Sequence, residues 1–285
     1  SSMNELSELM GVTCTVDIGL MSINYTCFDG DNSFSQSLCL TNTGVNTSQL
    51  NRLEKFVSDF QEKYLPESCD KIHTALDEIQ RIHGLYSPLT LALAAALACG
   101  SFTFLLGGGI IEMLCAFFGA GIGNFIRCKL SKHHFTLFLC ITASIACSCL
   151  TYTALLKLLE LIYSVNLQHE AGYICSMLFI IPGFPFITVA TMTSWILSML
   201  LGLKPLSFLP LHLALWQWIL FRLLASFCGV FGFSIMFNSP LRLAAAAGVI
   251  GAAANTIRLE STDLLSLPPA AAAFIGAFLA GILAS

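Results

Sequence analysis

Charged side chains are scarce in this sequence. Only 11% of its 285 residues are Asp, Glu, Lys or Arg, whereas hydrophobic residues make up 56%. A soluble domain ordinarily carries about 25% charged residues. The scarcity argues against an ordinary soluble protein, and no basic patch is large enough to indicate a nucleic-acid partner.

Motifs for catalysis and cofactor binding are absent as well. The sequence contains no HExxH, no GxSxG and no Walker A motif, and its 12 cysteines include no CxxC pair. Most of these cysteines lie in apolar runs, where Cys behaves as a small hydrophobe. We therefore expect no enzymatic activity, no metal, no cofactor and no ATP-driven pumping by this chain alone.

The few charges are unevenly distributed. Residues 1–86 hold 12 of the 17 acids but only 5 of the 13 Lys and Arg, a net charge of −7, and the remainder has +3. Such a division separates a water-facing part from a lipid-embedded part. The first part, residues 1–86, is expected to be a soluble domain of its own.

Within this first domain the patterns predict an α+β unit. Two β-like runs at 13–28 and 33–41 flank a turn of Asp29, Gly30, Asp31 and Asn32, which predicts a hairpin. Apolar residues at helical spacing predict one helix over 48–64, with Ser48 as its N-cap, and another over 67–83.

Beyond residue 86 the chain consists of long apolar runs. A helix rises 1.5 Å per residue, so about 20 apolar residues cross the ~30 Å hydrocarbon core of a bilayer. The fold class predicted is an all-α polytopic membrane bundle, with one segment broken by proline, behind the small α+β domain. We count seven hydrophobic segments, at residues 88–106, 110–126, 135–163, 171–203, 206–237, 241–257 and 268–284.

The loop at residues 127–134 sets the predicted orientation. It contains Arg127, Lys129 and Lys132 followed by two histidines, and basic loops are retained in the cytoplasm. The N-terminal domain lies two spans earlier and is therefore predicted to be cytoplasmic too. We accordingly expect its cysteines to be free thiols, since disulfides persist in oxidising compartments.

A proline pair interrupts the fourth apolar run. Pro182 and Pro185, with Gly183, remove backbone donors and free carbonyls at the depth of the membrane, which is tolerated only against protein or a water-filled cavity. Broken helices of this kind often build substrate sites in transporters, and the hydroxyls of Thr188 and Thr191 could line one. A simple kink is the alternative.

Ionisable residues inside apolar runs are functional hypotheses by default. Glu112 follows the triplet Gly107, Gly108 and Gly109, and it is either part of a proton or substrate pathway or a helix cap favoured by the dipole. Arg222 has either a structural partner or a role with solute or proton. Small residues, with Gly119 and Gly123 as examples, favour close helix packing.

The arrangement of these motifs resembles the threonine/serine exporter family. The run at 76–127, with its glycine triplet followed by an acid, is similar to the opening of that family's membrane part, and Ile-Pro-Gly-Phe-Pro at 181–185 to its broken helix. Phe-Asn-x-Pro around Asn238, within 230–285, resembles the start of its second module. The resemblance implies a first transmembrane module at 87–229 and a truncated second one at 230–285.

The resemblance also implies a function. It predicts a multi-pass protein of the bacterial inner membrane that exports threonine and serine using the proton gradient, without a cofactor. Glu112 would be the family's acidic residue, and Asn238 would join it on the substrate and proton pathway. Related two-component systems are associated with export of dicarboxylates such as succinate. A membrane sensor or scaffold whose cytosolic domain binds a partner is the other alternative, and assembly into a homo-oligomer stays open.

The predicted topology can be tested by labelling. A thiol reagent that does not cross membranes should fail to modify Gly30→Cys and Ser131→Cys in intact cells, because both positions are expected to face the cytoplasm. Both should react after permeabilisation. Labelling of both variants in intact cells would contradict the orientation.

Overall fold

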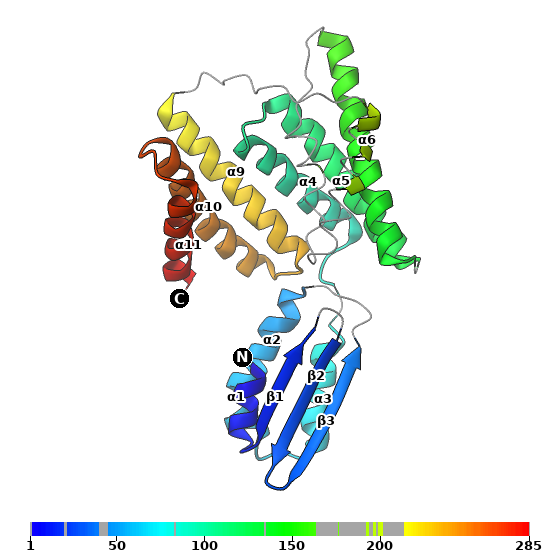
Figure 1. Cartoon of the computed structure of the whole chain (residues 1–285), viewed down its shortest axis with the longest axis vertical. Coiled ribbons are helices and arrows are strands. Elements are labelled where there is room, and N and C mark those ends of the chain that lie inside the picture. Colours follow the sequence, from blue (N-terminus) through cyan, green and yellow to red (C-terminus); the bar gives the residue numbers. More distant parts are fainter. Residues whose placement is uncertain are drawn as a thin grey trace. The chain divides into compact units, whose positions relative to one another are not determined.

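The structure is a computed structural model of the whole chain. It describes residues 2–19, 22–39, 45–82, 84–133, 135–163 and 214–284, together with Ser176 and some positions between 192 and 201. These residues form two compact units, Ser1–Gly84 and Leu85–Ser285 (Figure 1).

The first unit contains a three-stranded antiparallel sheet and short helices. The strands follow one another in the order β1-β2-β3. Helix α1, which the sequence patterns did not reveal, precedes the sheet, and the other helices follow it. The elements are α1 Ser2–Leu9, β1 Thr13–Ile18, β2 Ser22–Asp29, β3 Asn32–Cys39, α2 Thr47–Ser58, the π-helix Phe60–Tyr64 and α3 Cys69–Gln80.

Two local predictions for this unit are wrong. The run 13–28 is two strands rather than one, because the chain reverses where the N–H of Gly19 donates to the carbonyl of Ser22 at 2.8 Å. The N-cap of α2 is Asn46 and not Ser48. The Asn46 side chain accepts from the N–H of Gln49 at 3.3 Å, which satisfies one of the unpaired donors at the helix start.

The core of the first unit is helical. Phe56, Val57 and Phe60 are buried, and apolar side chains of α1 and α3 such as Leu6 and Ile72 pack against them. Every residue of β3 is exposed by contrast. The helices, rather than the sheet, therefore supply most of the hydrophobic stabilisation.

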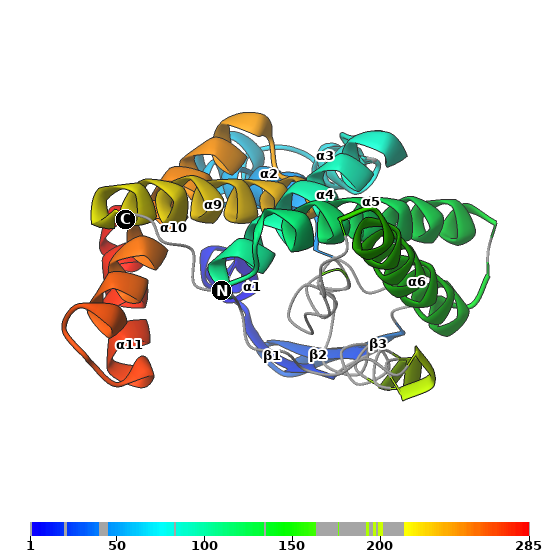
Figure 2. The ribbon, with the colours of Figure 1, turned by 90° about the horizontal axis from the view of Figure 1, so that it is seen from above.

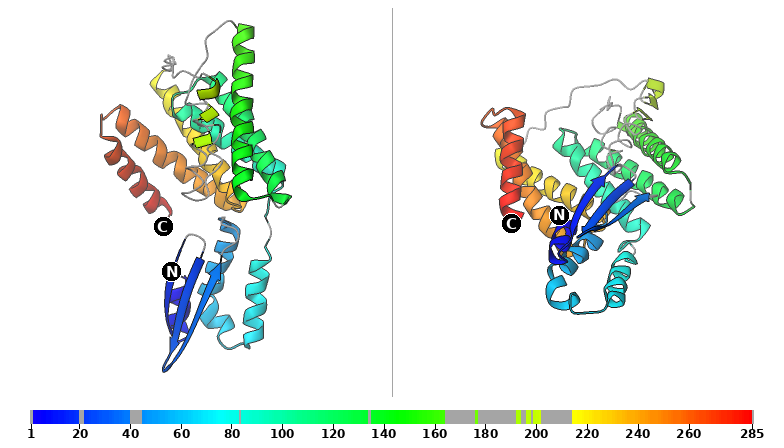
Figure 3. Two further views of the ribbon diagram at one scale, coloured as in Figure 1. Left: turned by 45° about the vertical axis from the view of Figure 1, so that its right-hand side comes forward. Right: turned by 60° about the horizontal axis from the view of Figure 1, so that its bottom comes forward.

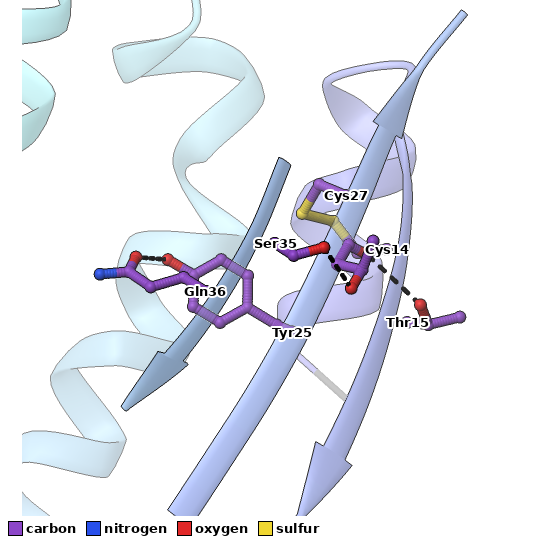
Figure 4. The surroundings of a disulfide bond; sticks show 7 residues. Cys14, Thr15, Tyr25, Cys27, Ser35 and Gln36 are labelled. Carbon is purple, nitrogen blue, oxygen red and sulfur yellow. Dashed lines mark hydrogen bonds between the residues drawn. A yellow bond between two sulfur atoms is a disulfide. The ribbon is translucent and has the colours of Figure 1, made fainter. Parts of the chain in front are cut away.

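A disulfide joins β1 to β2. Cys14 and Cys27 lie directly opposite each other in the antiparallel register and are bonded (Figure 4). The prediction of free thiols is wrong for this pair, whereas Cys39 is a free, exposed thiol. Because disulfides persist in oxidising compartments, the cytoplasmic placement of this unit now depends on Arg127, Lys129 and Lys132 alone. These residues were predicted to form a loop, but they belong to the end of helix Ile110–Lys132.

The second unit is a bundle of helices. Four of them, α4, α5, α6 and α9, are long and apolar enough to cross a membrane. The count of seven segments is not confirmed: α11 has only 16 residues, and most of the run 171–203 lies outside the described residues. The helices are α4 Pro88–Leu105, α5 Ile110–Lys132, α6 Leu137–Tyr163, α9 Leu215–Met236, α10 Leu241–Asp263 and α11 Pro269–Ala284.

Helices α4 and α9 pack together in antiparallel directions (Figures 1 and 2). Phe104 near the end of α4 contacts Phe221 in the first half of α9, whereas Gly232 near the end of α9 lies against Ala94 and Ala98. A Cβ atom at Gly232 would be 2.6 Å from the carbonyl oxygen of Ala94. The absence of a side chain there lets the two backbones approach closely, as small residues do between helices in lipid.

The two helix pairs α4–α5 and α9–α10 have the same turn. Gly107 and Asn238, 131 residues apart, both have positive φ, 96° and 61°. The residue after each donates from its backbone N–H to the carbonyl five residues earlier: Gly108 to Thr103 at 2.8 Å, and Ser239 to Ser234 at 3.0 Å. Gly and Asn are the residues that adopt this left-handed conformation most readily.

The repeated pairs are inverted with respect to each other. Their first helices, α4 and α9, are equivalent and antiparallel, and α5 and α10 have the same length of 23 residues. In a membrane this arrangement is an inverted-topology repeat, as found in many secondary transporters. Figure 3 shows each pair continuing into a third helix, α6 after α5 and α11 after α10.

The close contact of α4 with α9 predicts the effect of a single methyl group. Gly232→Ala should lower the melting temperature in detergent, because the methyl meets the backbone of Ala94 and Ala98. Such overpacking costs about 1–3 kcal/mol, and 1 kcal/mol shifts the midpoint by roughly 2–4 °C for a unit of this size. Gly281→Ala is the control, since a Cβ there meets no atom within 4 Å. A Gly232→Ala protein as stable as the control would contradict the contact.

Candidate functional site

The structure describes only part of the predicted pathway. Glu112, Arg222 and Asn238 are all described, as are the predicted packing glycines. The residues of the proline break and the two threonines after it, Pro182, Gly183, Pro185, Thr188 and Thr191, lie outside the described residues. Their role stays a prediction.

Glu112 is buried at the start of α5. Its side chain is in the first helical turn and the residue is 4% exposed. A Cβ atom at Gly109, the N-cap position, would lie 2.7 Å from Oε2 of Glu112, so the carboxylate folds back over the start of its own helix. The N–H groups and the dipole at a helix N-terminus stabilise a carboxylate in this place.

Asn238 ties the end of α9 to the start of α4. Its Oδ1 accepts from the N–H of Leu85 at 2.6 Å. Beside it, the hydroxyl of Tyr86 donates to the carbonyl of Ser239 at 2.6 Å, and burial raises the pKa of Tyr86 above its ordinary value. A tyrosine in this position keeps its proton and remains a hydrogen-bond donor. The two hydrogen bonds join the end of α9 to the start of α4.

Arg222 has structural partners. Its guanidinium donates to Glu260 Oε1 at 2.8 Å and also to Asp263, both at the end of α10. It also lies over the ring of Trp218, 5.2 Å from the centroid. Arg222 and Glu260 are only 17% and 15% exposed. Arg222 was expected to have either a structural partner or a role with solute or proton. The described residues supply partners for the structural role.

Two of the predicted packing glycines, Gly119 and Gly108, lie at tight contacts. A Cβ atom at Gly119 would be 2.9 Å from the carbonyl oxygen of Ser148 on α6, and one at Gly108 would be 2.6 Å from Cγ2 of Thr103. Gly123 is buried on the same helix as Gly119. Gly119 therefore lets α5 approach α6 closely, and Gly108 keeps the turn after α4 compact.

The sequence patterns missed a polar motif that occurs in both repeats. Asn124 and Arg127 on α5 correspond to Asn255 and Arg258 on α10, 131 residues later, with isoleucine before each arginine. Each arginine donates from Nε to Oδ1 of its asparagine, at 2.9 and 3.0 Å. A search for internal repeats would have found this Asn-x-Ile-Arg pair.

Each asparagine also donates a hydrogen bond to the helix that precedes its own. Nδ2 of Asn124 donates to the carbonyl of Leu91 on α4 at 2.8 Å, and Nδ2 of Asn255 donates to Oγ of Ser226 on α9 at 2.7 Å. The two motifs therefore hold an arginine in the same way at opposite ends of the bundle, because α4 and α9 are antiparallel.

A cavity of about 270 Å³ adjoins the second of these motifs. Its polar wall consists of Ser226, Asn255 and Arg258, and its apolar wall includes Phe102 and Leu105 of α4. The cavity therefore combines a cation, an amide and a hydroxyl with aliphatic and aromatic surface. Binding sites for small molecules typically have this composition.

The chain is an α-helical integral membrane protein with an inverted repeat and a small polar domain. Residues 1–191, two thirds of the chain, match the family model ThrE, whose description is "Putative threonine/serine exporter". The chain belongs to this family, which is one of transporters and not of enzymes, and the resemblance seen in the sequence motifs is confirmed over these residues. No curated protein and no solved structure matches the chain.

The ion pair between α9 and α10 predicts a coupling energy. Arg222→Gln and Glu260→Gln should each lower the stability, and the double variant should lose less than the sum. We expect a coupling of about 1 kcal/mol, since the pair is only partly shielded from water. Thermal unfolding of the four proteins measures it.

The exposed pair Lys63 and Asp59 is the matched control, with a lysine side chain 61% exposed, and its cycle should show no measurable coupling. Strict additivity for Arg222 and Glu260 would show that the ion pair does not join α9 to α10 in solution.

Proposed function

We propose that the chain is a secondary-active exporter of small polar amino acids, threonine and serine, driven by the proton gradient. The observation that carries the proposal is membership of the threonine/serine exporter family over residues 1–191. Two further observations support it: the inverted helix pairs, an architecture common among secondary transporters, and a buried carboxylate within the bundle.

In this proposal, Glu112 is the residue that binds and releases the transported proton. The carboxylate of Glu112 is buried in the first turn of α5, and it would take up a proton from one side and release it to the other as access alternates. The broken helix at Pro182, Gly183 and Pro185, with Thr188 and Thr191, would contribute to the same pathway. Residues 1–86 would lie in the cytoplasm.

The proposal predicts proton-driven movement of labelled solute. Proteoliposomes loaded with labelled threonine, serine or succinate are given a pH gradient, and efflux is compared with that at equal pH. We expect the gradient to accelerate loss of threonine and serine. Acceleration of succinate alone would instead indicate the dicarboxylate alternative, and no movement of any solute would leave the sensor alternative.

Glu112→Gln separates the roles of this residue in the same assay. Glutamine keeps the size and most hydrogen bonds but cannot ionise. If Glu112 carries the proton, the variant should lose uphill efflux driven by the pH gradient and retain exchange of threonine at equal concentrations. If it binds the ammonium group of the solute, both should fail for amino acids. Uphill efflux equal to that of the unmodified protein would leave Glu112 as a helix cap only.

A further inference from the structure

The arginines of the repeated motif differ from Arg222 in their partners. An arginine inside a membrane bundle is costly and ordinarily pairs with an acid, as Arg222 does with Glu260 and Asp263. Within the described residues neither Arg127 nor Arg258 forms an ion pair. Each instead receives a neutral partner, the Oδ1 atom of its asparagine.

With this neutral partner, the two terminal nitrogens of the guanidinium have no ion pair within the described residues. Arg258 uses Nε for Asn255, so the N–H groups of its two terminal nitrogens are not spent on that contact. The fork of an arginine matches the two oxygens of a carboxylate. The brace from Asn255 to Ser226 of α9 restricts the orientation of the asparagine, and through it that of the guanidinium.

The cavity beside Arg258 is an open pocket between helices. Three helices besides α10 contribute to its cavity, with Phe102 from α4, Ser226 from α9 and Gly276 from α11. A Cβ atom at Gly276 would lie 3.1 Å from Cβ of Arg258, so α11 crosses directly over the root of the arginine. The described lining residues include no acid, so none of them neutralises the positive charge of Arg258.

We infer that this cavity binds the carboxylate of the transported solute, with Arg258 as the binding group and Asn255 and Ser226 as its polar supports. The apolar wall of Phe102 and Leu105 takes the short aliphatic part of the solute. The inference rests on the proposed function and adds a subsite to it. The shared ligand chemistry is the carboxylate, which amino acids and dicarboxylates have in common.

The occurrence of the motif in both repeats supports a built site. Arg127 and Arg258 each lie five residues before the end of their helix, 131 residues apart, and each is held through Nε by an asparagine that braces the neighbouring helix. Because the repeats are inverted, the two arginines lie at opposite ends of the bundle. Each end of the bundle therefore has one arginine held in this way.

Binding to the purified full chain tests the inference. The shift of its melting temperature is measured with increasing threonine and with threonine amide, which lacks the carboxylate, at equal ionic strength. Threonine should stabilise the protein and the amide should not. Arg258→Gln should weaken the apparent affinity for threonine at least tenfold, and Arg258→Lys should lie between, since lysine keeps the charge but not the fork. Arg242→Gln is the control, an exposed arginine on the same helix, and should bind as the unmodified protein does.

Three outcomes overturn the inference: threonine amide stabilises as well as threonine does, threonine does not stabilise the protein, or Arg258→Gln binds threonine within twofold of the control. If Arg258→Gln does not fold, Arg258→Lys decides by the same comparison. A lipid phosphate is the other source of an anion. If anionic phosphatidylglycerol added to phosphatidylcholine bilayers stabilises the protein only while Arg258 is present, and threonine does not compete, the site belongs to lipid and the inference fails.

Transport assays with and without Arg258 test the inference and the proposed function separately. If proteoliposomes export threonine equally well with and without Arg258, the exporter stands and the subsite falls. If the unmodified protein binds threonine through Arg258 but moves no solute in either direction, the subsite stands and the exporter falls.

Discussion

The close approach of α4 to α9 is the contact on which the rest of the membrane unit depends. Between helices in lipid there is no hydrophobic driving force, so stability comes from packing and from hydrogen bonds. Gly232 permits backbone contact with Ala94 and Ala98, and the antiparallel direction of this contact makes the two helix pairs inverted copies. The cavity at Arg258, lined by residues of both helices, exists because they meet in this way.

Four charged side chains of the bundle are stabilised in three different ways. Arg222 is neutralised by two acids on α10, so it joins helices. Glu112 lies over the N-terminus of its own helix, where backbone groups stabilise it. Within the described part of the chain, Arg127 and Arg258 each receive an amide oxygen, which orients a guanidinium without cancelling its charge. The proposed carboxylate site at Arg258 rests on this last arrangement, which differs from the paired state of Arg222.

Much of the secondary structure could be predicted from the sequence. The apolar runs at 88–106 and 135–163 agree with α4 and α6 to within two residues, because length and hydropathy decide what crosses a bilayer. The run at 110–126 has the start of α5, but the helix continues to Lys132 through the basic residues. The alternation over 13–28 predicts one strand, because it does not show the reversal at which Gly19 donates to the carbonyl of Ser22. The pairing of Cys14 with Cys27 depended on strand register, which the spacing of the cysteines does not specify.

The sequence by itself determined that the chain is a membrane protein, that a polar domain precedes the apolar helices, and which family the chain belongs to. These properties follow from hydropathy and from motifs local in the chain. It also contained the second Asn-x-Ile-Arg, 131 residues after the first. Only the tertiary structure decided that Arg222 meets Glu260 and that the repeats run in opposite directions. Those facts depend on which helix faces meet and in which direction, and such contacts join residues far apart in the chain that no local pattern relates.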